Sequence, residues 1–574
     1  MKKLKNILAV VLLAAATFSC NDVLDKGPLD SYSENDVWKS TDLTQAFLYT
    51  TLRISTDKLI QNDRWTDNDI ILDDGEATAI NKDLKDRYYD AGWNVYENIR
   101  RCNLVIAKMA DAPFTEGERA NFIAQAKFFR AMTYFSRARF FGKLMLVKEL
   151  VDKDEDMTQY GRTATIKDTY DFILQDLKDA ASGLRASEPT GMPTKGAAYA
   201  LLAEAALHGA AYIESGQSEY YEIARQASED LFALNVYSLD TDYKNMFNDF
   251  DHSQNSKEII LAQWKSSDNT IFQNTWMQDL VPNNDNNKNK EGSLPLLVEE
   301  LAGWPKSFPS VDLVNQYLVV DEDGKAKEWD ETSYYQNFLA KGGYVSNAIY
   351  KNRDNRFYAS IAQDSSNYFK NTITMRKKGN LNWASKAAEI WGTPISGYVY
   401  RKGVYEAVRL LNSEPTSYHY VLLRLGRSYL NYAEVMLRQN KVNAAIEYIN
   451  KTRTVHGGLP ELPSGLSAEE AWKEYKRERR IELLHENDRY WSLLRWGKAD
   501  GLEIVKELNT HQNACMEIAE DGKSFEIIDL PSNISDNNHA FTSRRYLFPV
   551  PQSERDVNLS LIHISEPTRL ALIS

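Results

Sequence analysis

Apolar residues recur every three or four positions over long stretches of this chain, which is the spacing of amphipathic helices. Between residues 420 and 439 they fall at i, i+3, i+7, i+10, i+11 and i+14, on one face of a helix. A second stretch, residues 441–453, repeats the pattern at once and ends before Gly457 and Gly458. The two stretches predict a helical hairpin whose first helix buries Leu422, Leu425, Tyr429, Tyr432, Ala433 and Met436.

Paired stretches of the same kind occur twice more, at residues 124–142 with 168–184 and at residues 195–213 with 220–234. Small residues such as Ala203 let neighbouring helices approach closely. The alternation of large and small residues is typical of tetratricopeptide-like packing, although a strict 34-residue repeat is absent. We therefore predict a mostly α-helical fold, in which tetratricopeptide-like hairpins form a scaffold over residues 40–250 and 410–500.

The helical period fades in the middle of the chain, from about residue 250 to 410. Short β-like runs at 258–263 and 398–400 lie between Gly, Pro and Trp residues, and residues 283–289 form a polar run. Because sites concentrate on loops, we predict that this loop-rich region binds ligand. Residues 22–70 also look irregular, with Asp and Ser at turn positions.

The first 20 residues have the form of a secretory signal peptide. Three lysines precede an apolar run from Ile7 to Ala16, which is too short to span a bilayer, and small residues lead to Cys20. A cysteine directly after such a run resembles a bacterial lipobox, which implies that Cys20 is lipidated and becomes the mature N-terminus. We therefore predict a signal peptide over residues 1–19 and a lipid anchor at Cys20.

The other end of the chain contains LSLIHISEPTR, which reads like a translated adapter from a sequencing library. We therefore predict that residues 559–574 are a non-native tail. Residues 20–558 are then a single body.

Composition and charge exclude several classes of protein. The chain has 68 Lys and Arg residues against 81 Asp and Glu residues, a net charge of −13 that disfavours nucleic acid as a partner. Its three cysteines show no disulfide framework and no zinc-ligand spacing. Residues 320–325 have acidic spacing reminiscent of a calcium loop, but they lack the full set of ligands, which favours a plain turn.

Catalytic motifs are missing as well, since the sequence contains no HExxH, GxSxG or GxxxxGK[ST]. Glu478 and Glu482 lie one helical turn apart, as an acid/base pair might, but arginines surround them. This pattern favours a structural ion-pair network over a glycosidase pair. We predict that the protein is not an enzyme and uses no cofactor or metal.

Four stretches together resemble the SusD/RagB family of outer-membrane nutrient-binding lipoproteins. They are the lipidated opening at 20–25, the helix and its exit at 124–147, the late signature at 478–498 and the closing segment at 546–558. Met145 stands where the family usually has proline, and Ser492 stands where an acidic residue is common. The order of the four stretches along the chain strengthens the resemblance.

The resemblance implies a SusD-like α-α superhelix with a looped face that binds ligand. It also implies a cell-surface protein, anchored in the outer membrane by lipid, that captures an oligosaccharide or polysaccharide. Members of the family act as the lid of a SusC-like TonB-dependent transporter, and no catalytic activity belongs to them.

Sugar binding requires aromatic faces for the pyranose ring and polar groups for its hydroxyls. The candidates are Trp65, Asp67, Asp69, Trp93, Asn94, Asn98, Trp276 and Trp304. For each tryptophan among them, packing in the core is an equal alternative. Trp472, Trp491 and Trp496 have helical spacing and are predicted to lie in the core.

Two other interpretations remain open. A tetratricopeptide-type scaffold that binds only proteins would share the same fold and would take no small ligand. Within the favoured family, the ligand could be a peptide rather than a glycan.

Overall fold

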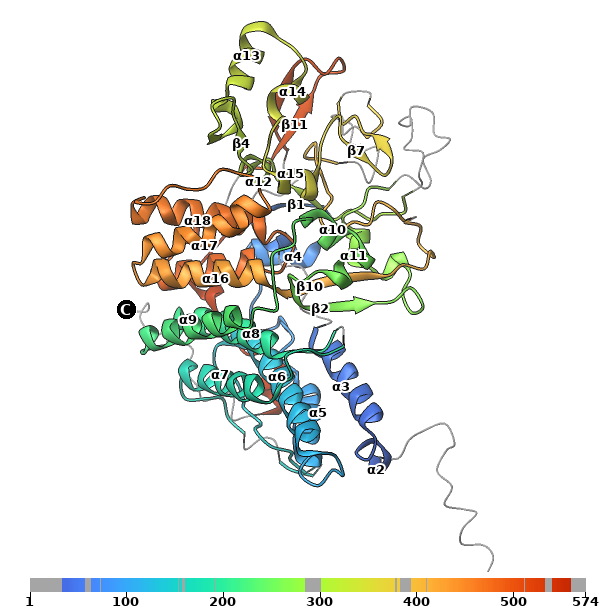
Figure 1. Cartoon of the computed structure of the whole chain (residues 1–574), viewed down its shortest axis with the longest axis vertical. Helices are drawn as coiled ribbons and strands as arrows, with labels where there is room; N and C mark the ends of the chain where they lie inside the picture. Colours follow the sequence, from blue (N-terminus) through green and yellow to red (C-terminus); the bar gives the residue numbers. More distant parts are fainter. Residues whose placement is uncertain are drawn as a thin grey trace, which may run out of the picture.

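The computed structural model describes residues 34–558 with the exception of short segments at 57–62, 73, 153, 157–159, 190, 284–300, 377–378, 382–393, 409, 510–511 and 532–538. The predicted signal peptide, Cys20 and the predicted tail lie outside the described residues, as does most of the polar run at 283–289. Figure 1 shows a stack of helices below and beside a less regular upper part. No helix of the described segments combines the length and apolarity needed to cross a bilayer.

The first half of the stack consists of helices that pack on one another in chain order. They are α5 (Tyr96–Lys108), α6 (Glu116–Phe141), α7 (Ile166–Gly183), α8 (Lys195–Ala210) and α9 (Gln217–Ala233). Capping boxes start α6 and α7, with Thr115 and Glu118 at the first and Thr165 and Asp168 at the second. The hairpins predicted from the apolar period are therefore confirmed.

Close helix packing in this half depends on a residue without a side chain. A Cβ atom added to Gly209 on α8 would lie 2.7 Å from the ring of Tyr170 and 2.9 Å from that of Tyr220. Gly209 thus lets α7, α8 and α9 approach, in line with the small residues of α8 noted in the sequence.

The second half of the stack comes from much later in the chain. It consists of α16 (Leu425–Arg438), α17 (Val442–Val455), α18 (Ala468–Glu482) and α19 (Arg489–Ala499). Helix α16 packs on α8 and α9, so the two halves form one continuous stack with α17 and α18 beyond it (Figure 1). The mostly helical fold is confirmed. Trp491 and Trp496 lie in its core as predicted, whereas Trp472 is partly buried and packs against that core.

Two boundaries differ from the prediction. Residues 420–424, read from the sequence as the start of a helix, belong to strand β10 (Tyr418–Arg424), because this segment pairs antiparallel with β2 (Ile259–Lys265). In the segment read as irregular, α3 (Thr41–Thr56) is a helix of 16 residues. Its five threonines have low helix propensity. They are accommodated in part because the hydroxyls of Thr51 and Thr56 donate to the carbonyls four residues earlier.

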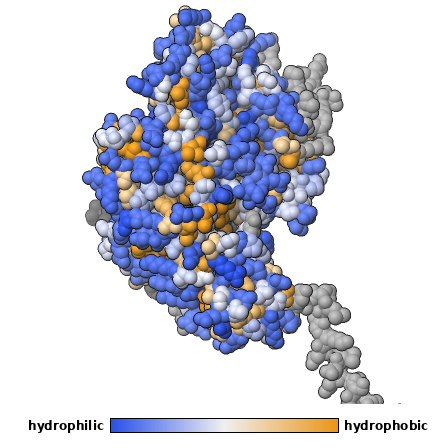
Figure 2. All heavy atoms as spheres, viewed as in Figure 1, coloured by the Kyte–Doolittle hydropathy of each residue, from blue (hydrophilic) through white to orange (hydrophobic). Residues whose placement is uncertain are grey.

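The middle of the chain folds on a second apolar core with short helices and two-stranded sheets. The paired strands are β1 (Asp69–Ile71) with β3 (Ser307–Pro309), β4 (Val319–Val320) with β5 (Ala326–Lys327), β6 (Ile361–Ala362) with β9 (Val399–Tyr400), β7 (Asn367–Tyr368) with β8 (Asn371–Thr372), and β11 (Ala514–Ile518) with β12 (Phe525–Asp529). The short helices in or beside this region are α4 (Gly75–Asn81), α10 (Tyr243–Asn248), α11 (Phe250–Asn255), α12 (Val311–Asn315), α13 (Ser333–Lys341), α14 (Val345–Ile349) and α15 (Asn355–Ser360). Two others lie outside it, α2 (Glu34–Val37) before α3 and α20 (Gln552–Val557) near the end of the described chain. The face seen in Figure 2 is largely hydrophilic, with hydrophobic residues gathered near the middle of the molecule.

A buried network of ion pairs joins this region to α18. Arg356 on α15 contacts both Glu478 and Glu482, and Arg424 lies 2.7 Å from both Glu482 and Glu258. Burial alone would raise the pKa of Glu482, but His456 and Arg424 outweigh it and hold this pKa well below its usual range. The prediction of a structural network at Glu478 and Glu482 is confirmed.

Candidate functional site

A cavity of about 520 Å³ opens between the helical stack and the middle region, and we call it the aromatic cavity. Its aromatic lining residues are Trp65, Tyr89, Phe140, Trp276 and Trp491. Its charged and amide lining residues are Arg64, Asp74, Glu76, Asp90, Arg137, Arg139, Asp279 and Asn487. The volume lies in the usual range of small-ligand pockets, and the mixture of rings and polar groups is what a sugar requires.

Trp65 lies at the end of a single 3-10 turn, η1 (Asp63–Trp65), just before β1. Its ring meets the ring of Tyr490 edge-on at 5.2 Å between centroids and that of Phe140 at 6.3 Å. These contacts hold the indole at the cavity wall while leaving it only partly buried.

Trp276 begins a second 3-10 turn, η4 (Trp276–Asp279), which belongs to the middle region of the chain. A Cβ atom added to Gly403 would lie 2.0 Å from this indole, and Gly403 has a φ of +81°. Only glycine therefore leaves room for the ring. The indole Nε1 of Trp276 is buried and has no hydrogen-bond acceptor among the described residues.

Polar groups of the cavity are held in place by one another. Arg64 donates to Asp279 at 2.5 Å and to Asp74 at 3.1 Å, so two carboxylates and a guanidinium share one rim. Burial alone would lower the pKa of Arg64, but Asp279 raises it above its ordinary value. Such an array offers both donors and acceptors to sugar hydroxyls.

The wall opposite is supplied by the turn between α18 and α19. His485 and Asn487 both have left-handed backbone, with φ of 58° and 55°. The side chain of Asn487 accepts a hydrogen bond from the indole of Trp491 at 3.3 Å. Non-glycine residues in this conformation carry strain that the surrounding structure must support. Two such residues in one turn show that the surrounding contacts fix the backbone of this wall.

Arg139 is the cavity's most unusual cation. It is 8 % exposed, and its guanidinium carbon lies 4.6 Å from the centre of the Trp491 ring. Within the part of the chain that the structure describes, its Nε has no acceptor. Burial lowers the pKa of Arg139 to about 10, which still leaves it charged at neutral pH.

The structure separates the predicted site residues into several groups. Trp65 and Trp276 meet in the aromatic cavity. Trp93 is 2 % exposed and packs edge-on against Phe141, while the buried Asn98 donates to Ser55 and Thr133. Their faces are covered by protein, so we remove Trp93 and Asn98 from the candidate site.

Asn94 and Trp304 lie on the surface and do not line the aromatic cavity. Trp304 is 52 % exposed, and its backbone N–H donates to the carbonyl of Gln278 in the turn that carries Trp276. It is therefore placed next to the cavity's second tryptophan rather than inside the cavity.

Asp67 and Asp69 are buried and already engaged. Arg489 donates to both carboxylate oxygens of Asp67, at 3.0 and 2.8 Å, and Arg480 lies 3.1 Å from the same group. Asp69 accepts from the hydroxyls of Ser307 and Tyr400, and burial raises the pKa of Asp69 to about 6. Both aspartates fix the segment that carries Trp65 and do not face the aromatic cavity.

Sequence reasoning missed most of the cavity's lining. Tyr89, Arg137 and Asn487 come from separate segments, and only Trp276 and Asp279 belong to the loop-rich middle. The aromatic run of α6 and the turn after α18 lie in two of the stretches that resemble the SusD/RagB family. That resemblance was the signal in the sequence that could have pointed to these lining residues.

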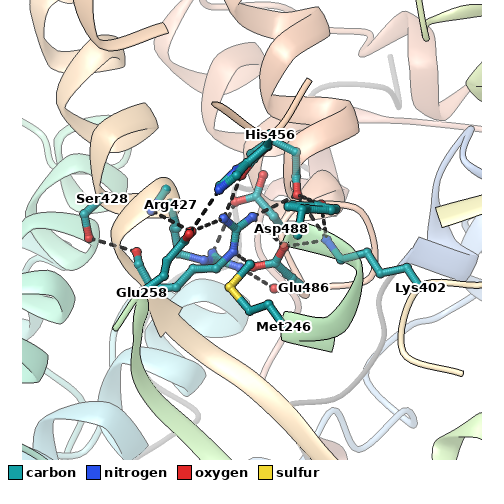
Figure 3. Close-up of polar contacts among 12 residues, drawn as sticks. Met246, Glu258, Lys402, Arg427, Ser428, His456, Glu486 and Asp488 are labelled. Atoms are coloured by element: carbon teal, nitrogen blue, oxygen red, sulfur yellow. Dashed lines mark hydrogen bonds and ion pairs between the residues drawn. The ribbon is translucent and has the colours of Figure 1, made fainter. Parts of the chain in front are cut away.

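The buried trio of Glu258, His456 and Glu482 has ligand atoms close enough together to hold a metal ion. His456 instead uses both ring nitrogens, at 2.8 Å from Glu482 and 3.1 Å from Glu258 (Figure 3). Burial alone would lower the pKa of His456, but the two carboxylates raise it to about 10, so the ring is an imidazolium. With Arg424 on the same carboxylates, protein cations occupy the place a metal would take.

Comparison with known proteins identifies the family. The SusD family model matches residues 257–565, and a second model, described as starch-binding associating with outer membrane, matches residues 39–207. The chain belongs to the SusD family. It is 23% identical over 437 residues to a SusD-like protein of Bacteroides ovatus, covering 73% of this chain and 67% of that one.

Solved structures of SusD-like proteins share the fold. One from Bacteroides fragilis has a TM-score of 0.72 at 22% identity and covers 93% of this chain and 99% of its own. A laminarin-binding SusD-like protein has a TM-score of 0.57 at 16% identity, with coverage of 92% and 98%. The predicted membership of the SusD/RagB family and the SusD-like fold are thus confirmed.

Proposed function

We propose that this SusD-family protein captures an oligosaccharide in the aromatic cavity and does not chemically change it. The observation that carries the proposal is the meeting of Trp65 and Trp276 in one cavity whose rim holds Arg64, Asp74 and Asp279. An indole stacks on the apolar face of a pyranose ring, and charged or amide groups bind its hydroxyls. The laminarin binding of one structural relative supports a glycan as the ligand class.

Trp304 enters the proposal as an outer contact. Its exposed ring lies beside the turn that carries Trp276, so it is positioned to touch a sugar unit that extends beyond the cavity. We expect Trp304→Ala to weaken the binding of long oligomers and to leave that of short ones unchanged.

The protein's place in the cell forms part of the same proposal. A lipid on Cys20 would hold it at the outer membrane, in keeping with the description of the second matching family model. From there it would pass its ligand to a SusC-like TonB-dependent transporter. Substitution Cys20→Ser is expected to move the protein from the membrane fraction to the soluble fraction, and co-purification from intact membranes tests for the transporter.

Calorimetry with neutral oligosaccharides tests the binding site directly. The full chain, purified in detergent, is titrated with glucan and xyloglucan oligomers beside Trp276→Ala, Asp279→Asn and the control Tyr344→Ala. Tyr344 is 51 % exposed and is not part of the cavity lining. Truncating a central tryptophan costs about 2 kcal/mol or more of binding free energy, a loss of at least about thirtyfold in affinity.

Three results would count against this function. Equal affinity of wild type and Trp276→Ala would remove the aromatic cavity as the site. Absence of binding to every glycan, together with saturable binding of peptides, would favour a peptide-binding protein. Shortening of the oligosaccharide during the titration would show that the protein is an enzyme.

A further inference from the structure

A second cavity, of about 580 Å³, lies on the other side of the 63–69 segment, and we call it the cationic cavity. Six cationic side chains line it, against three carboxylates, and none of its described lining residues is aromatic. The cations are Lys473, Lys476, Arg477, Arg480, Arg489 and Lys506. In a chain with a net charge of −13, this is a local concentration of positive charge.

The lysines of the cationic cavity are not neutralised. Lys473, Lys476 and Lys506 have no carboxylate within ion-pair distance among the described residues. The ammonium of Lys476 lies 5.2 Å from the ring centre of Trp496, which fixes its stem without cancelling its charge. Three lysines without a carboxylate partner among the described residues therefore line one cavity.

The arginines form its rigid floor. Arg480 and Arg489 are each 7 % exposed and share the carboxylate of Asp67, and Arg480 also pairs with the exposed Asp312 at 2.7 Å. Arg480 also donates to Asn68 Oδ1 at 2.8 Å, and its position on α18 is set by the buried network behind it. The paired arginines thus supply ordered guanidinium groups, and the excess of positive charge comes from the lysines.

Polar uncharged groups complete the lining. Ser310, Asn315, Gln316, Gln512 and Asn513 contribute hydroxyl and amide groups beside the lysines. The volume is far larger than a free phosphate or sulfate needs and falls within the range of cavities that hold organic ligands. Amides suit sugar hydroxyls, and ammonium groups suit the carboxylates or sulfates attached to a sugar.

We propose that the cationic cavity binds an oligosaccharide that carries anionic groups, either uronate carboxylates or sulfate esters. A cleft lined by one sign of charge concentrates ligands of the opposite sign even when the whole protein repels them. The inference deepens the proposed function and rests on it, because it assigns the captured glycan an acidic class. Arg64 and Trp65 line the aromatic cavity while Asp67 lines the cationic one, so a single segment separates the two.

A matched pair of ligands and a matched pair of variants test the inference. The full chain in detergent is titrated with galacturonate tetramer and with neutral galactose tetramer at about 50 mM salt, where charge interactions are weakly screened. The test variant is Lys473→Gln with Lys476→Gln and Lys506→Gln. The control variant removes the same charge from three exposed lysines elsewhere, as Lys39→Gln with Lys325→Gln and Lys341→Gln.

The inference predicts that the test variant loses at least about tenfold in affinity for the galacturonate tetramer, while the control variant stays within about twofold of wild type. Sulfated galactose tetramer should behave as the galacturonate tetramer does. Equal affinities in the two variants would overturn the inference, as would a failure of both acidic tetramers to bind wild type.

Two further measurements distinguish a failure of the proposed function from a failure of this inference. Inorganic sulfate that binds the cavity as tightly as the sulfated tetramer would overturn the assignment to a saccharide, because the sugar would contribute nothing. Trp276→Ala reports on the aromatic cavity alone. If Trp276→Ala leaves all binding unchanged while the lysine variant abolishes the binding of acidic oligosaccharides, the aromatic cavity is not the binding site and the cationic cavity is.

Discussion

The aromatic cavity and the cationic cavity are similar in volume, at about 520 and 580 Å³, but their linings differ completely. The first has five aromatic rings and cations that are largely balanced by carboxylates. The second has free lysines and amides on a floor of two paired arginines. Volume sets how much ligand can enter a cavity, whereas the lining decides which chemical class is bound.

Both cavities depend on the same supporting elements. Helix α18 turns Glu478 and Glu482 toward the buried network and Lys473 and Arg480 toward the cationic cavity. The turn after α18 then supplies Asn487 to the aromatic cavity. A change in the network should therefore affect both cavities, while a change in either lining should affect one.

Asp67→Asn should produce the largest effect, on the cationic side. Removing one partner of a buried ion pair costs about 3–5 kcal/mol, because Arg489 would lose its ion-pair partner and Arg480 would keep only the exposed Asp312. We expect that loss in the free energy of unfolding, measured by chemical denaturation, together with tighter binding of acidic oligomers.

Asp312→Asn is the matched control, since the Asp312 side chain is 64 % exposed and pairs with the same Arg480. An exposed ion pair contributes about 1 kcal/mol or less. A similar loss in both variants would show that burial of Asp67 is not what makes its pairs important.

Gly403→Ala should act on the aromatic side, with a smaller effect. The new methyl group would collide with the indole of Trp276, and the φ of +81° disfavours a side chain. We expect about 1–3 kcal/mol of destabilisation and at least about tenfold weaker binding of neutral oligosaccharide in calorimetry.

Gly324→Ala separates strain from collision, because Gly324 has a φ of +77° and no atom within 4 Å of the added methyl group. It should lose stability but retain sugar affinity. If the Gly324 variant also bound sugar more weakly, the effect of Gly403→Ala could not be assigned to its collision with the indole of Trp276.

Salt should distinguish the two cavities without any mutation. Raising ionic strength from about 0.05 to 0.5 M screens charges near the surface, so the affinity for galacturonate tetramer should fall several-fold. The affinity for neutral tetramer should not change, because stacking does not depend on charge. A parallel decline for both ligands would contradict the distinction between the linings.

A pH series should act on the buried network that supports both cavities. Folding raises the pKa of His456 from 6.5 to about 10, so the folded state binds its proton more tightly than the unfolded state does. The stability from this pair is complete below pH 6.5 and is lost as pH rises through about 10.

His456→Gln isolates this contribution. The difference in unfolding free energy between wild type and variant should be largest near pH 6 and should shrink toward pH 10. Lys402 acts in the opposite direction, since burial lowers its pKa to about 8, but it is present in both proteins and cancels in the difference. A difference that grows with pH would show that His456 is not the bridging cation.

Part of this molecule could be predicted from local patterns. The 3.6-residue period identified the hairpins of α6 with α7, α8 with α9 and α16 with α17. The same reasoning failed at residues 420–424, because whether these residues form a strand depends on a partner more than 150 positions away. It failed at α3 because threonine hydroxyls find backbone acceptors only once the helix exists.

The candidate site divides in the same way. The sequence alone determined the helical scaffold, the family resemblance and the choice of Trp65 and Trp276 as tryptophans flanked by polar residues in irregular segments. Only the tertiary structure decided that these two share a cavity, that Trp93 is buried and that Asp67 serves two arginines. The physical reason is that helix periodicity is a local property, whereas burial and charge pairing depend on segments that meet only when the chain has folded.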